Sequence, residues 1–544
     1  MQRLALLLAT ACSSSHAVDS DAPVAPDAPG DAATIANARC ATVTTDPDVH
    51  QALPAATVEL DPPVVHGAIT QVHAGDSLQA AIDAAAPGDT LELEAGATFT
   101  GPFTLPEKTG SDWIVIRTAT PDTAFAMPGT RVSPSNAAAM PKLVASSTVV
   151  TVAPRAHNYR LIGLEVTATA GTYVNAMIDL TVSSADAADL AHDIIVDRAY
   201  LHGDPVGARR GVALNAAGAA VIDSYIAGFR EQGADSQAIA GWTGPGPYVI
   251  ANNYLEAASE NIMFGGSDPA IAQLRPADIY VCHNYLTKDV SWRGGGWVVK
   301  NLFELKNARR VVVAGNVMEN NWEDGQVGFA VLLTPRNQDG TAPWSGVEDV
   351  TIAYNIVRHT GSGLNMLSSD TPNTSEPLQR AVVHDNLFDD INSATWGGQG
   401  RAFQFVNGQG GGPAVKVDHN TATTDDNAAL LLGDTPNYGA GFMFTNNLVP
   451  HGSYGVFGSG QSEGTAALTY YLPSYTLTHN AIVGGGAPAA YPTGNFFPAS
   501  FAAAGVAADW SLTATSSLKG AGTDGKDLGA DITAITAATA GAAN

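Results

Sequence analysis

Short runs of alternating apolar and polar residues recur along most of the chain, and many of them end at a corner marked by Asn. The repeated units read ANNYL (251–255), CHNYL (282–286), AGNVM (314–318), AYNIV (353–357), HDNLF (384–388), DHNTA (418–422), TNNLV (445–449) and THNAI (478–482). Their corner residues are Asn253, Asn284, Asn316, Asn355, Asn386, Asn420, Asn447 and Asn480, at steps of 31, 32, 39, 31, 34, 27 and 33 residues. A period of this length, carried by β-branched residues, is typical of stacked coils of short parallel strands.

The pattern therefore predicts an all-β fold, a single-stranded right-handed parallel β-helix. Asn tolerates the left-handed backbone of a sharp corner, and its amide can bond to the Asn one coil above. Ahead of the coils, GDS followed by LQAAIDAAA predicts a short helix with Asp76 or Ser77 as its N-cap. Such a helix would cover the open edge of the first coil.

The two ends of the chain lack this periodicity. Residues 1–12 combine MQR, a short apolar run and Ala9-Thr10-Ala11-Cys12, which resembles a bacterial lipobox and would place a lipid on Cys12. An ordinary secretory signal is the alternative, and both predict export. Residues 13–66, rich in Ala, Pro and Asp, are predicted to form a disordered tether. We expect one solenoid domain over 67–531 and a disordered tail over 532–544.

Composition narrows the possible partners. A net charge of −26 argues against nucleic acid, which would normally require a basic face. Three cysteines do not form a disulfide framework. Cys40 and Cys282 could pair, but their separation and the strand position of Cys282 favour a buried free thiol. We expect a monomer that meets a membrane only through its amino-terminal lipid.

A polar ladder is predicted on the outer face of one sheet. If Phe303 and Leu305 point inward, alternation turns Glu304 and Lys306 outward, and it does the same for Asn365 and Gln404 in later coils. Such a ladder suits an extended polysaccharide. Residues 288–401 hold ten of the 26 Lys and Arg and carry a net charge of −3, so this zone favours an acidic glycan. We expect Lys300 and Arg358 to contribute to it.

Three short motifs resemble polysaccharide lyase family 6, the alginate and dermatan lyases. They are SENIMFGGS (259–267), ELKNARRVVVAGN (304–316) and TPRNQDG (334–340). The resemblance implies β-elimination of a uronic acid, with Lys306 as the base and Arg336 assisting protonation of the leaving oxygen. It also implies a calcium ion held by Glu304. The further ligands expected for that ion are Asn261, Asn301 and Asp268.

The chain also departs from that family. The family's Arg in the first strand is Met263 here, the His after the Arg is Asn337, and the Ser after the lysine is Asn307. Each change removes a substrate or orienting contact, so the substrate can differ. We assign Asn261 and Asn337 to substrate binding as well.

Other residues could take part in the site. Trp322 and Trp344 lie on loops beside the proposed face, where they could stack on sugar rings or pack the loops. His359, after the Asn355 corner, is a second candidate base.

Two other functions stay open. An inverting glycoside hydrolase could draw paired acids from Glu304, Glu323, Asp324 or Asp339. A non-catalytic glycan-binding solenoid is the third reading. The lyase is favoured because a Lys and an Arg one coil apart suit proton transfer better than scattered acids do.

Overall fold

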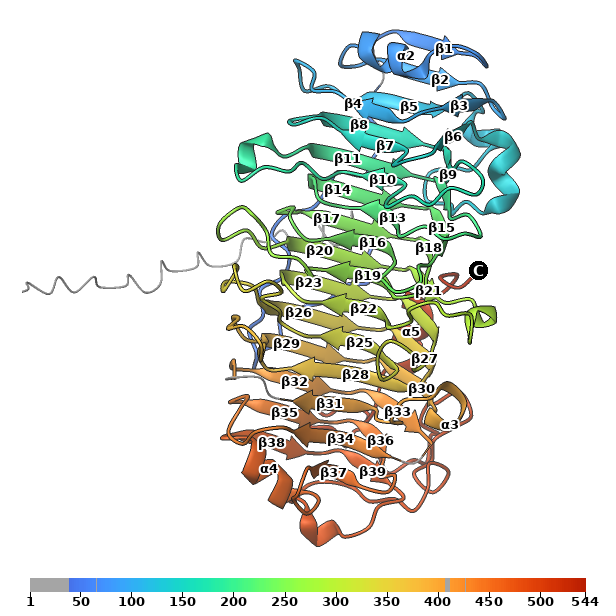
Figure 1. The fold of residues 1–544 in the computed structure, drawn as a ribbon. Helices are drawn as coiled ribbons and strands as arrows, with labels where there is room; N and C mark the ends of the chain where they lie inside the picture. The colour runs from blue at the N-terminus through green and yellow to red at the C-terminus, as the bar shows by residue number, and fades with distance from the viewer. Residues whose placement is uncertain (1–38, 65, 407–410, 426) are drawn as a thin grey trace, which may run out of the picture.

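The computed structural model describes residues 39–64, 66–406, 411–425 and 427–544. These residues form an elongated right-handed parallel β-helix, as the Asn period predicts (Figure 1). Each coil passes through three sheets in the same order, which we name A, B and C. The predicted signal, Cys12 and residues 13–38 of the predicted tether lie outside the described residues.

All strand pairing within the three sheets is parallel, and neighbours in each sheet are one coil apart. Sheet A contains β1 (Ile69–Val72), β2 (Thr90–Leu93), β5 (Ile114–Thr118), β8 (His157–Ile162), β11 (His192–Asp197), β14 (Ala217–Ile222), β17 (Tyr248–Ala251), β20 (Ala277–Cys282), β23 (Ala308–Ala314), β26 (Val347–Ala353), β29 (Gln379–His384), β32 (Val415–Asp418), β35 (Phe442–Thr445) and β38 (Tyr475–Thr478). Sheet B contains β3 (Thr98–Thr100), β6 (Lys142–Ala145), β9 (Glu165–Ala168), β12 (Tyr200–His202), β15 (Tyr225–Phe229), β18 (Tyr254–Ala257), β21 (Tyr285–Thr287), β24 (Val317–Asn321), β27 (Ile356–Thr360), β30 (Leu387–Ile391), β33 (Thr421–Thr424), β36 (Leu448–Pro450) and β39 (Ala481–Val483). Sheet C contains β4 (Phe103–Leu105), β7 (Val150–Val152), β10 (Ile178–Asp179), β13 (Arg210–Ala213), β16 (Gln237–Gly241), β19 (Glu260–Phe264), β22 (Asn301–Leu305), β25 (Phe329–Leu333), β28 (Ser362–Leu367), β31 (Phe403–Val406), β34 (Ala428–Gly433) and β37 (Gly455–Gly458).

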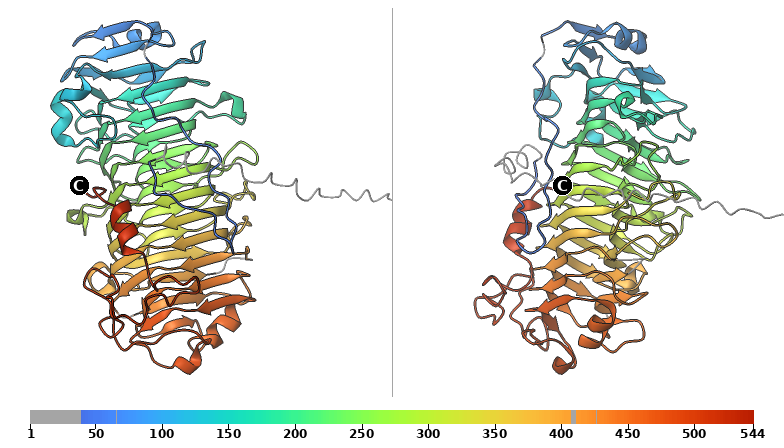
Figure 2. Two further views of the ribbon diagram at one scale, coloured as in Figure 1. Left: turned by 180° about the vertical axis from the view of Figure 1, so that it is seen from behind. Right: turned by 90° about the vertical axis from the view of Figure 1, so that its left-hand side faces the viewer.

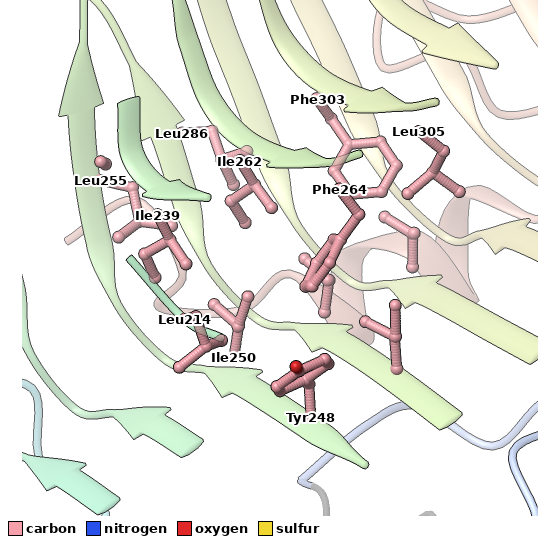
Figure 3. Packing of buried hydrophobic residues seen from close by; sticks show 14 of the residues in the cluster. Leu214, Ile239, Tyr248, Ile250, Leu255, Ile262, Phe264, Leu286, Phe303 and Leu305 are labelled. Carbon is pink, nitrogen blue, oxygen red and sulfur yellow. The ribbon is translucent and has the colours of Figure 1, made fainter. Parts of the chain in front are cut away.

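The core fills the space enclosed by the three sheets. Side chains that alternate inward stack on the equivalent side chain of the next coil, as Ile262 and Phe264 do on Phe303 and Leu305 (Figure 3). Their complete burial removes apolar surface from water at each coil, which is the main source of stability in a solenoid.

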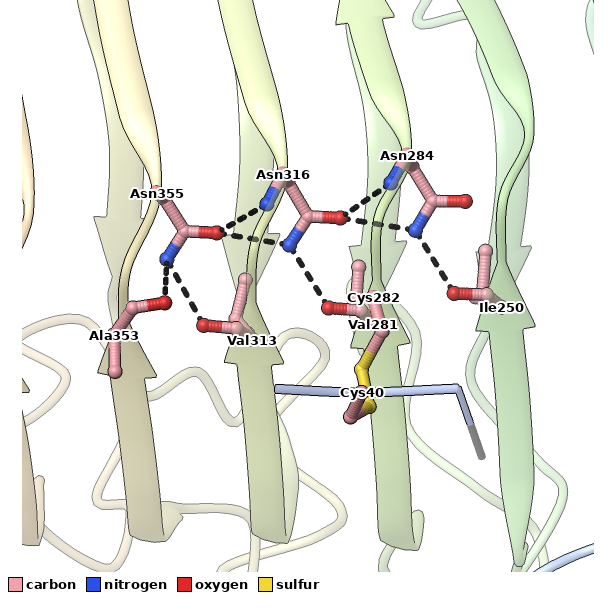
Figure 4. The surroundings of a disulfide bond; sticks show 9 residues. All are labelled: Cys40, Ile250, Val281, Cys282, Asn284, Val313, Asn316, Ala353 and Asn355. Carbon is pink, nitrogen blue, oxygen red and sulfur yellow. Dashed lines mark hydrogen bonds between the residues drawn. A yellow bond between two sulfur atoms is a disulfide. The ribbon is translucent and has the colours of Figure 1, made fainter. Parts of the chain in front are cut away.

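A continuous ladder of buried amides follows the corner between sheets A and B. Asn316 Oδ1 accepts from the Asn284 backbone nitrogen at 2.9 Å and from Asn284 Nδ2 at 3.0 Å. Asn316 Nδ2 donates to Asn355 Oδ1 at 2.9 Å and to Val281 O at 2.8 Å (Figure 4). The left-handed backbone belongs to the residue before the ladder Asn, as at His283, where φ is 56°. The ladder Asn is therefore needed for the hydrogen bonds of its side-chain amide, and not for a left-handed backbone.

We expect Asn316→Ala to lower the free energy of unfolding by about 3 kcal/mol, because it leaves several buried donors and acceptors without partners. Guanidinium denaturation would measure the loss, with the exposed Gln232→Ala as control. A loss equal to that of the control would contradict a stabilising role for the ladder.

Short helices close the two ends of the solenoid. Helix α2 (Leu78–Ala84) has Ser77 as its N-cap, one of the two predicted residues, because Ser77 Oγ accepts from Ala80 N at 3.2 Å. Its Leu78 and Ile82 are buried at the first coil. At the other end α4 (Thr465–Tyr471) buries Leu468 and Tyr471 near β37. Helix α3 (Ser393–Trp396) lies in a loop between β30 and β31.

The prediction of a disordered tether up to residue 66 is wrong for residues 39–64. This segment forms a strap along the outer face of sheet A (Figure 2). Its buried residues, Val43, Val49, Val58 and Leu60, belong to one apolar cluster with sheet A residues or lie beside it. Gln51, fully buried, donates from Nε2 to Thr351 Oγ1 at 3.0 Å. The strap covers a sheet face that would otherwise expose apolar side chains.

The prediction of a free thiol at Cys282 is also wrong. Cys40 and Cys282 form a disulfide with a Cα–Cα distance of 5.1 Å (Figure 4). Cys282 lies in the apolar cluster under the strap, so the cysteine far upstream in sequence reaches it when the strap is in place.

The prediction of a disordered tail over 532–544 is wrong as well. Helix α5 (Ile532–Ala538) begins at the N-cap Asp531 and runs back along the solenoid (Figure 2). Arg131 Nη1 donates to Ala542 O at 2.7 Å, which fixes the end of the chain against the middle coils. Among the helices in the described part of the chain, none has the length and apolar character needed to cross a membrane.

Candidate active site

A cavity of about 310 Å³ opens on the outer face of sheet C. It is lined by Glu304, Lys306, Gln326, Val327, Phe329, Leu332, Thr334, Arg336 and Asn365. Four of these residues, Glu304, Lys306, Arg336 and Asn365, were singled out from the sequence as site residues. They come from three consecutive coils, and the structure brings them together.

Strand alternation and register explain why these residues meet. Phe303 and Leu305 are fully buried in the core, which confirms the predicted inward positions on β22. One column of sheet C pairs Glu304 with Leu332, Leu332 with Asn365, and Asn365 with Gln404. Gln404 Nε2 donates to Asn365 Oδ1 at 2.9 Å, so this part of the predicted polar ladder is formed.

Lys306 and Arg336 lie just beyond the ends of two adjacent strands of sheet C, β22 and β25. The Arg336 backbone nitrogen donates to Lys306 O at 2.9 Å, which fixes the two residues one coil apart. The Lys306 Nζ lies 3.7 Å from Glu304 Oε2. Arg336 Nη1 donates to Asp370 Oδ1 at 2.5 Å, and the Arg336 side chain is 34% exposed. An amine and a guanidinium therefore share one cavity, each beside a buried carboxylate.

Two neighbours hold the Glu304 carboxylate in place. Asn301 Nδ2 donates to Oε2 at 3.0 Å, and Thr334 Oγ1 donates to Oε1 at 2.8 Å. Glu304 is almost completely buried. Both of its oxygens thus have partners, and its orientation is fixed.

A second ion cluster lies next to Glu304 on the same face. Lys300 forms an ion pair with Asp235 and lies 3.5 Å from Glu260 Oε1. Burial, followed by the charge of Glu304, raises the pKa of Glu260. Gln237 Nε2 donates to Glu260 Oε2 at 2.8 Å. Lys300 is therefore neutralised by protein carboxylates on this face.

Lys288 is a fully buried amine behind the site. Its Nζ donates to four oxygens: Ala257 O at 3.0 Å, Ser259 O at 2.8 Å, Asn261 Oδ1 at 3.0 Å and Asn301 O at 2.9 Å. Burial lowers its pKa to about 7. Lys288 ties the start of β19 to the start of β22.

The predicted placement of Asn261 on the outer face is wrong. Its Nδ2 donates to Leu255 O at 2.8 Å and to Thr287 O at 2.6 Å, and the residue is fully buried. Both acceptors belong to strands of sheet B, β18 and β21, so the side chain is turned toward that sheet. Asn261 therefore cannot contact a glycan bound on the outer face of sheet C.

The ligands predicted for calcium do not gather. Asp268 Oδ2 accepts from Thr341 N at 2.8 Å and from Asp339 N at 3.1 Å, so it joins two loops. Asn301 turns its amide nitrogen toward Glu304. Among the described residues no three His, Cys, Asp or Glu side chains are placed to hold a metal ion. With Lys306 beside Glu304 in addition, the donor set does not fit calcium, which stays an unsupported prediction.

Several other predicted contacts lie away from the cavity. Asn337 is buried, and its Nδ2 donates to Thr374 O at 2.8 Å, so it organises the loop after β25. Trp322 is buried in a cluster with Trp292 and Val299. Trp344 donates from Nε1 to Leu274 O at 3.1 Å. These residues shape loops, which was the alternative reading for both tryptophans.

Arg358 and His359 belong to a different sheet. Both lie on β27 of sheet B, where Arg358 forms an ion pair with Glu319 and His359 Nδ1 lies 3.9 Å from the same carboxylate. His359 has a left-handed backbone and stacks on Trp396. Since neither residue lines the cavity, His359 is not placed to act as a base there.

The sequence did not single out Asp370, Glu260 or Lys288. Asp370 follows β28 in SSD, one coil after Arg336 follows β25, so coil spacing alone could have identified it. Glu260 and Lys288 gave no such signal, because their roles depend on burial and on contacts with other coils.

Comparisons with known proteins find solved structures of similar fold and low sequence identity. No family model and no curated protein matches the chain. The catalytic unit of a GH87 alpha-1,3-glucanase from Streptomyces thermodiastaticus strain HF3-3 has a TM-score of 0.47 and 14% identity, over 79% of this chain and 70% of that one. A mannuronic acid specific polysaccharide family 6 lyase from human gut microbiota has a TM-score of 0.40 and 12% identity, over 79% and 83%. Pectate lyase Pel9A has a TM-score of 0.31 and 14% identity, over 85% and 96%.

The similarity is one of fold. One of these structures is a lyase of the family that the three motifs resemble. At such identities a solenoid can carry different reactions, so the function has to be argued from the site.

Proposed function

We propose that the protein is an exported polysaccharide lyase that cleaves an acidic, uronate-containing polysaccharide by β-elimination. The observation that carries the proposal is that Lys306 and Arg336 line one open cavity on the outer face of sheet C. The disulfide between Cys40 and Cys282 supports export, because such bonds persist in oxidising compartments. A lipid on Cys12 remains part of the proposal.

The chemistry uses the residues of the cavity in turn. Lys306 takes the proton from C5 of the uronate onto its Nζ. The electron pair of that bond forms the C4–C5 double bond, and the bond from C4 to the leaving oxygen breaks. Arg336, held by Asp370, donates a hydrogen bond to the leaving oxygen, which then takes a proton from water. Glu304, 3.7 Å from Lys306, is the group that can receive the proton carried by the amine between turnovers.

The charge on the substrate carboxylate must be stabilised as the proton leaves. The Arg336 guanidinium is partly exposed and can form a bidentate pair with a carboxylate. No step is assigned to calcium, because the donor set does not fit it.

Hydrolysis is less well supported by the same cavity. Glu304 is the one carboxylate among the described residues that line it. Glu323 accepts from Gly398 N at 2.9 Å and Asp339 from Asp268 N at 3.4 Å, both outside the lining. Because an inverting hydrolase needs a pair of acids across the bond, the site favours elimination.

The test is incubation of the intact protein with alginate, pectate, dermatan and other uronate polymers. We expect ultraviolet absorbance from unsaturated uronate ends, growing with time. New reducing ends without that absorbance would identify a hydrolase. Retention on a polysaccharide column without any product would identify a glycan-binding protein, and either result would overturn the lyase.

A further inference from the structure

A second cavity, of about 280 Å³, lies on the same part of the molecule, toward the amino-terminal coils. It is lined by Arg209, Arg210, Trp242, Met263, Gly265, Gly266 and Ser267. A Cβ atom added at Gly266 would stand 3.1 Å from Met263 Cε and 3.7 Å from Lys306 Cδ. The wall of this cavity therefore adjoins the lysine of the candidate active site.

Arg210 brings a positive charge without a counter-charge to this cavity. Its guanidinium lies over the Trp242 ring, 5.1 Å from the centroid, and Nη1 contacts Asn175 Oδ1 at 3.4 Å. In the described part of the chain no carboxylate lies within ion-pair distance of Arg210, and its buried Nε has no hydrogen-bond partner. Burial, together with the charge of Arg209, lowers the pKa of Arg210. An anionic ligand would supply both the missing counter-charge and an acceptor for Nε.

The adjacent Arg209 is already engaged. Its Nε donates to Asp235 O at 3.0 Å and lies 3.6 Å from Glu231 Oε2. The two neighbouring arginines thus differ, and only Arg210 is available to a ligand.

The floor of the cavity leaves room for a sugar ring. Gly265 and Gly266 have φ angles of 98° and 82°, a backbone that favours glycine. A Cβ at Gly265 would stand 2.8 Å from Lys306 Cβ, so a larger residue there would push against the active-site lysine. With no side chain on the floor, Trp242 offers an aromatic face, which suits stacking against a pyranose.

We propose that this Arg210–Trp242 cavity is a second subsite, which binds an acidic sugar residue of the same glycan chain. The inference rests on the proposed function for the identity of the glycan. Strands β13 and β22 are three coils apart, which is about 14 Å at about 4.8 Å per strand. The glycan would therefore run along the solenoid axis, with the anionic group of one residue at Arg210 and the cleaved residue at Lys306.

The experiment compares Arg210→Gln with the wild-type protein, measuring KM, kcat and calorimetric binding of acidic oligosaccharides. For long oligosaccharides we expect about a tenfold weaker binding and a similar rise in KM, with kcat nearly unchanged, since one charge-assisted contact is lost. A disaccharide, too short to reach both cavities, should be affected much less. Arg210→Lys should restore part of the affinity.

Arg293→Gln is the matched control, because Arg293 also stacks on tryptophan rings but lies beside Trp322 and Trp396, away from both cavities. It should leave binding unchanged. Equal affinity of Arg210→Gln and wild type for long oligosaccharides would overturn the subsite while leaving the lyase intact. Loss of binding to neutral and acidic oligosaccharides alike would overturn its anion specificity. Carboxylated and sulfated oligosaccharides, tested separately, identify which anion it takes. If no uronate polymer is bound or cleaved by the wild type, the proposed function fails first.

Discussion

Replacing Lys306 by methionine is expected to lower the rate of unsaturated product formation by about a thousandfold, the usual contribution of a positioned base. Methionine keeps most of the side-chain volume and removes the amine that we propose as the base. Glu304, which loses the amine at 3.7 Å, keeps its hydrogen bonds from Asn301 and Thr334, so the fold should tolerate the change. Initial rates of absorbance increase measure the effect, and circular dichroism checks that the coil structure is intact.

Lys519→Met is the control for that variant, since Lys519 is an exposed lysine that pairs with Asp527 on the carboxyl-terminal segment. It should keep full activity. If Lys306→Met retains more than about a tenth of the wild-type rate, Lys306 is not the base. A hydrolase would instead lose its activity in Glu304→Gln and would release reducing ends without ultraviolet absorbance.

The coil period was predictable because each corner Asn has the same chemical task. Asn316 bonds to Asn284 and Asn355 on either side, so each coil that joins the ladder has the same residue at the same point, and the repeat is visible in the sequence. The alternation on β22 was predictable for a related reason. Phe303 and Leu305 must face the core, which leaves Glu304 outside.

The strap was not predictable from its own residues, because its apolar residues follow no helical or strand period. Val43, Val58 and Leu60 pack against sheet A and belong to no strand themselves. The signal lies instead in sheet A, where strands such as β17 and β23 carry apolar residues on both faces. A strand that is apolar on both faces indicates that another segment of the protein covers its outer side.

The positions of the site residues could be predicted where they depend only on the spacing of the coils. They could not be predicted where they depend on local contacts. Lys306 and Arg336 follow adjacent strands of sheet C, and the structure places them in one cavity. Asn261 was misplaced because its amide bonds to backbone oxygens of sheet B, which strand alternation does not reveal. His359 was misplaced because the corner after Asn355 leads into sheet B before the chain reaches sheet C.

The strap and the disulfide connect coils that are far apart in the solenoid, which contacts between neighbouring coils cannot do. Cys40 is joined to a coil at β20, the Asp46 side chain meets Lys416 on β32 at 2.9 Å, and Leu60 O accepts from Arg160 on β8 at 3.0 Å. One segment therefore connects coils far apart along the axis. Solenoids otherwise unfold from their ends, because each coil is held only by its neighbours.

We expect the double variant Cys40→Ser/Cys282→Ser to lose about 5 kcal/mol of unfolding free energy, because the bond closes a loop of 242 residues. The closed loop lowers the conformational entropy of the unfolded chain, and removing the disulfide restores that entropy. Denaturant titrations with and without a reductant measure the effect: the reductant should shift the wild-type midpoint down and leave the variant unchanged. Gln51→Ala, which removes three hydrogen bonds of the strap and keeps the disulfide, should cost less, about 2 kcal/mol. Equal midpoints for oxidised and reduced wild type would mean that apolar packing alone holds the strap on sheet A.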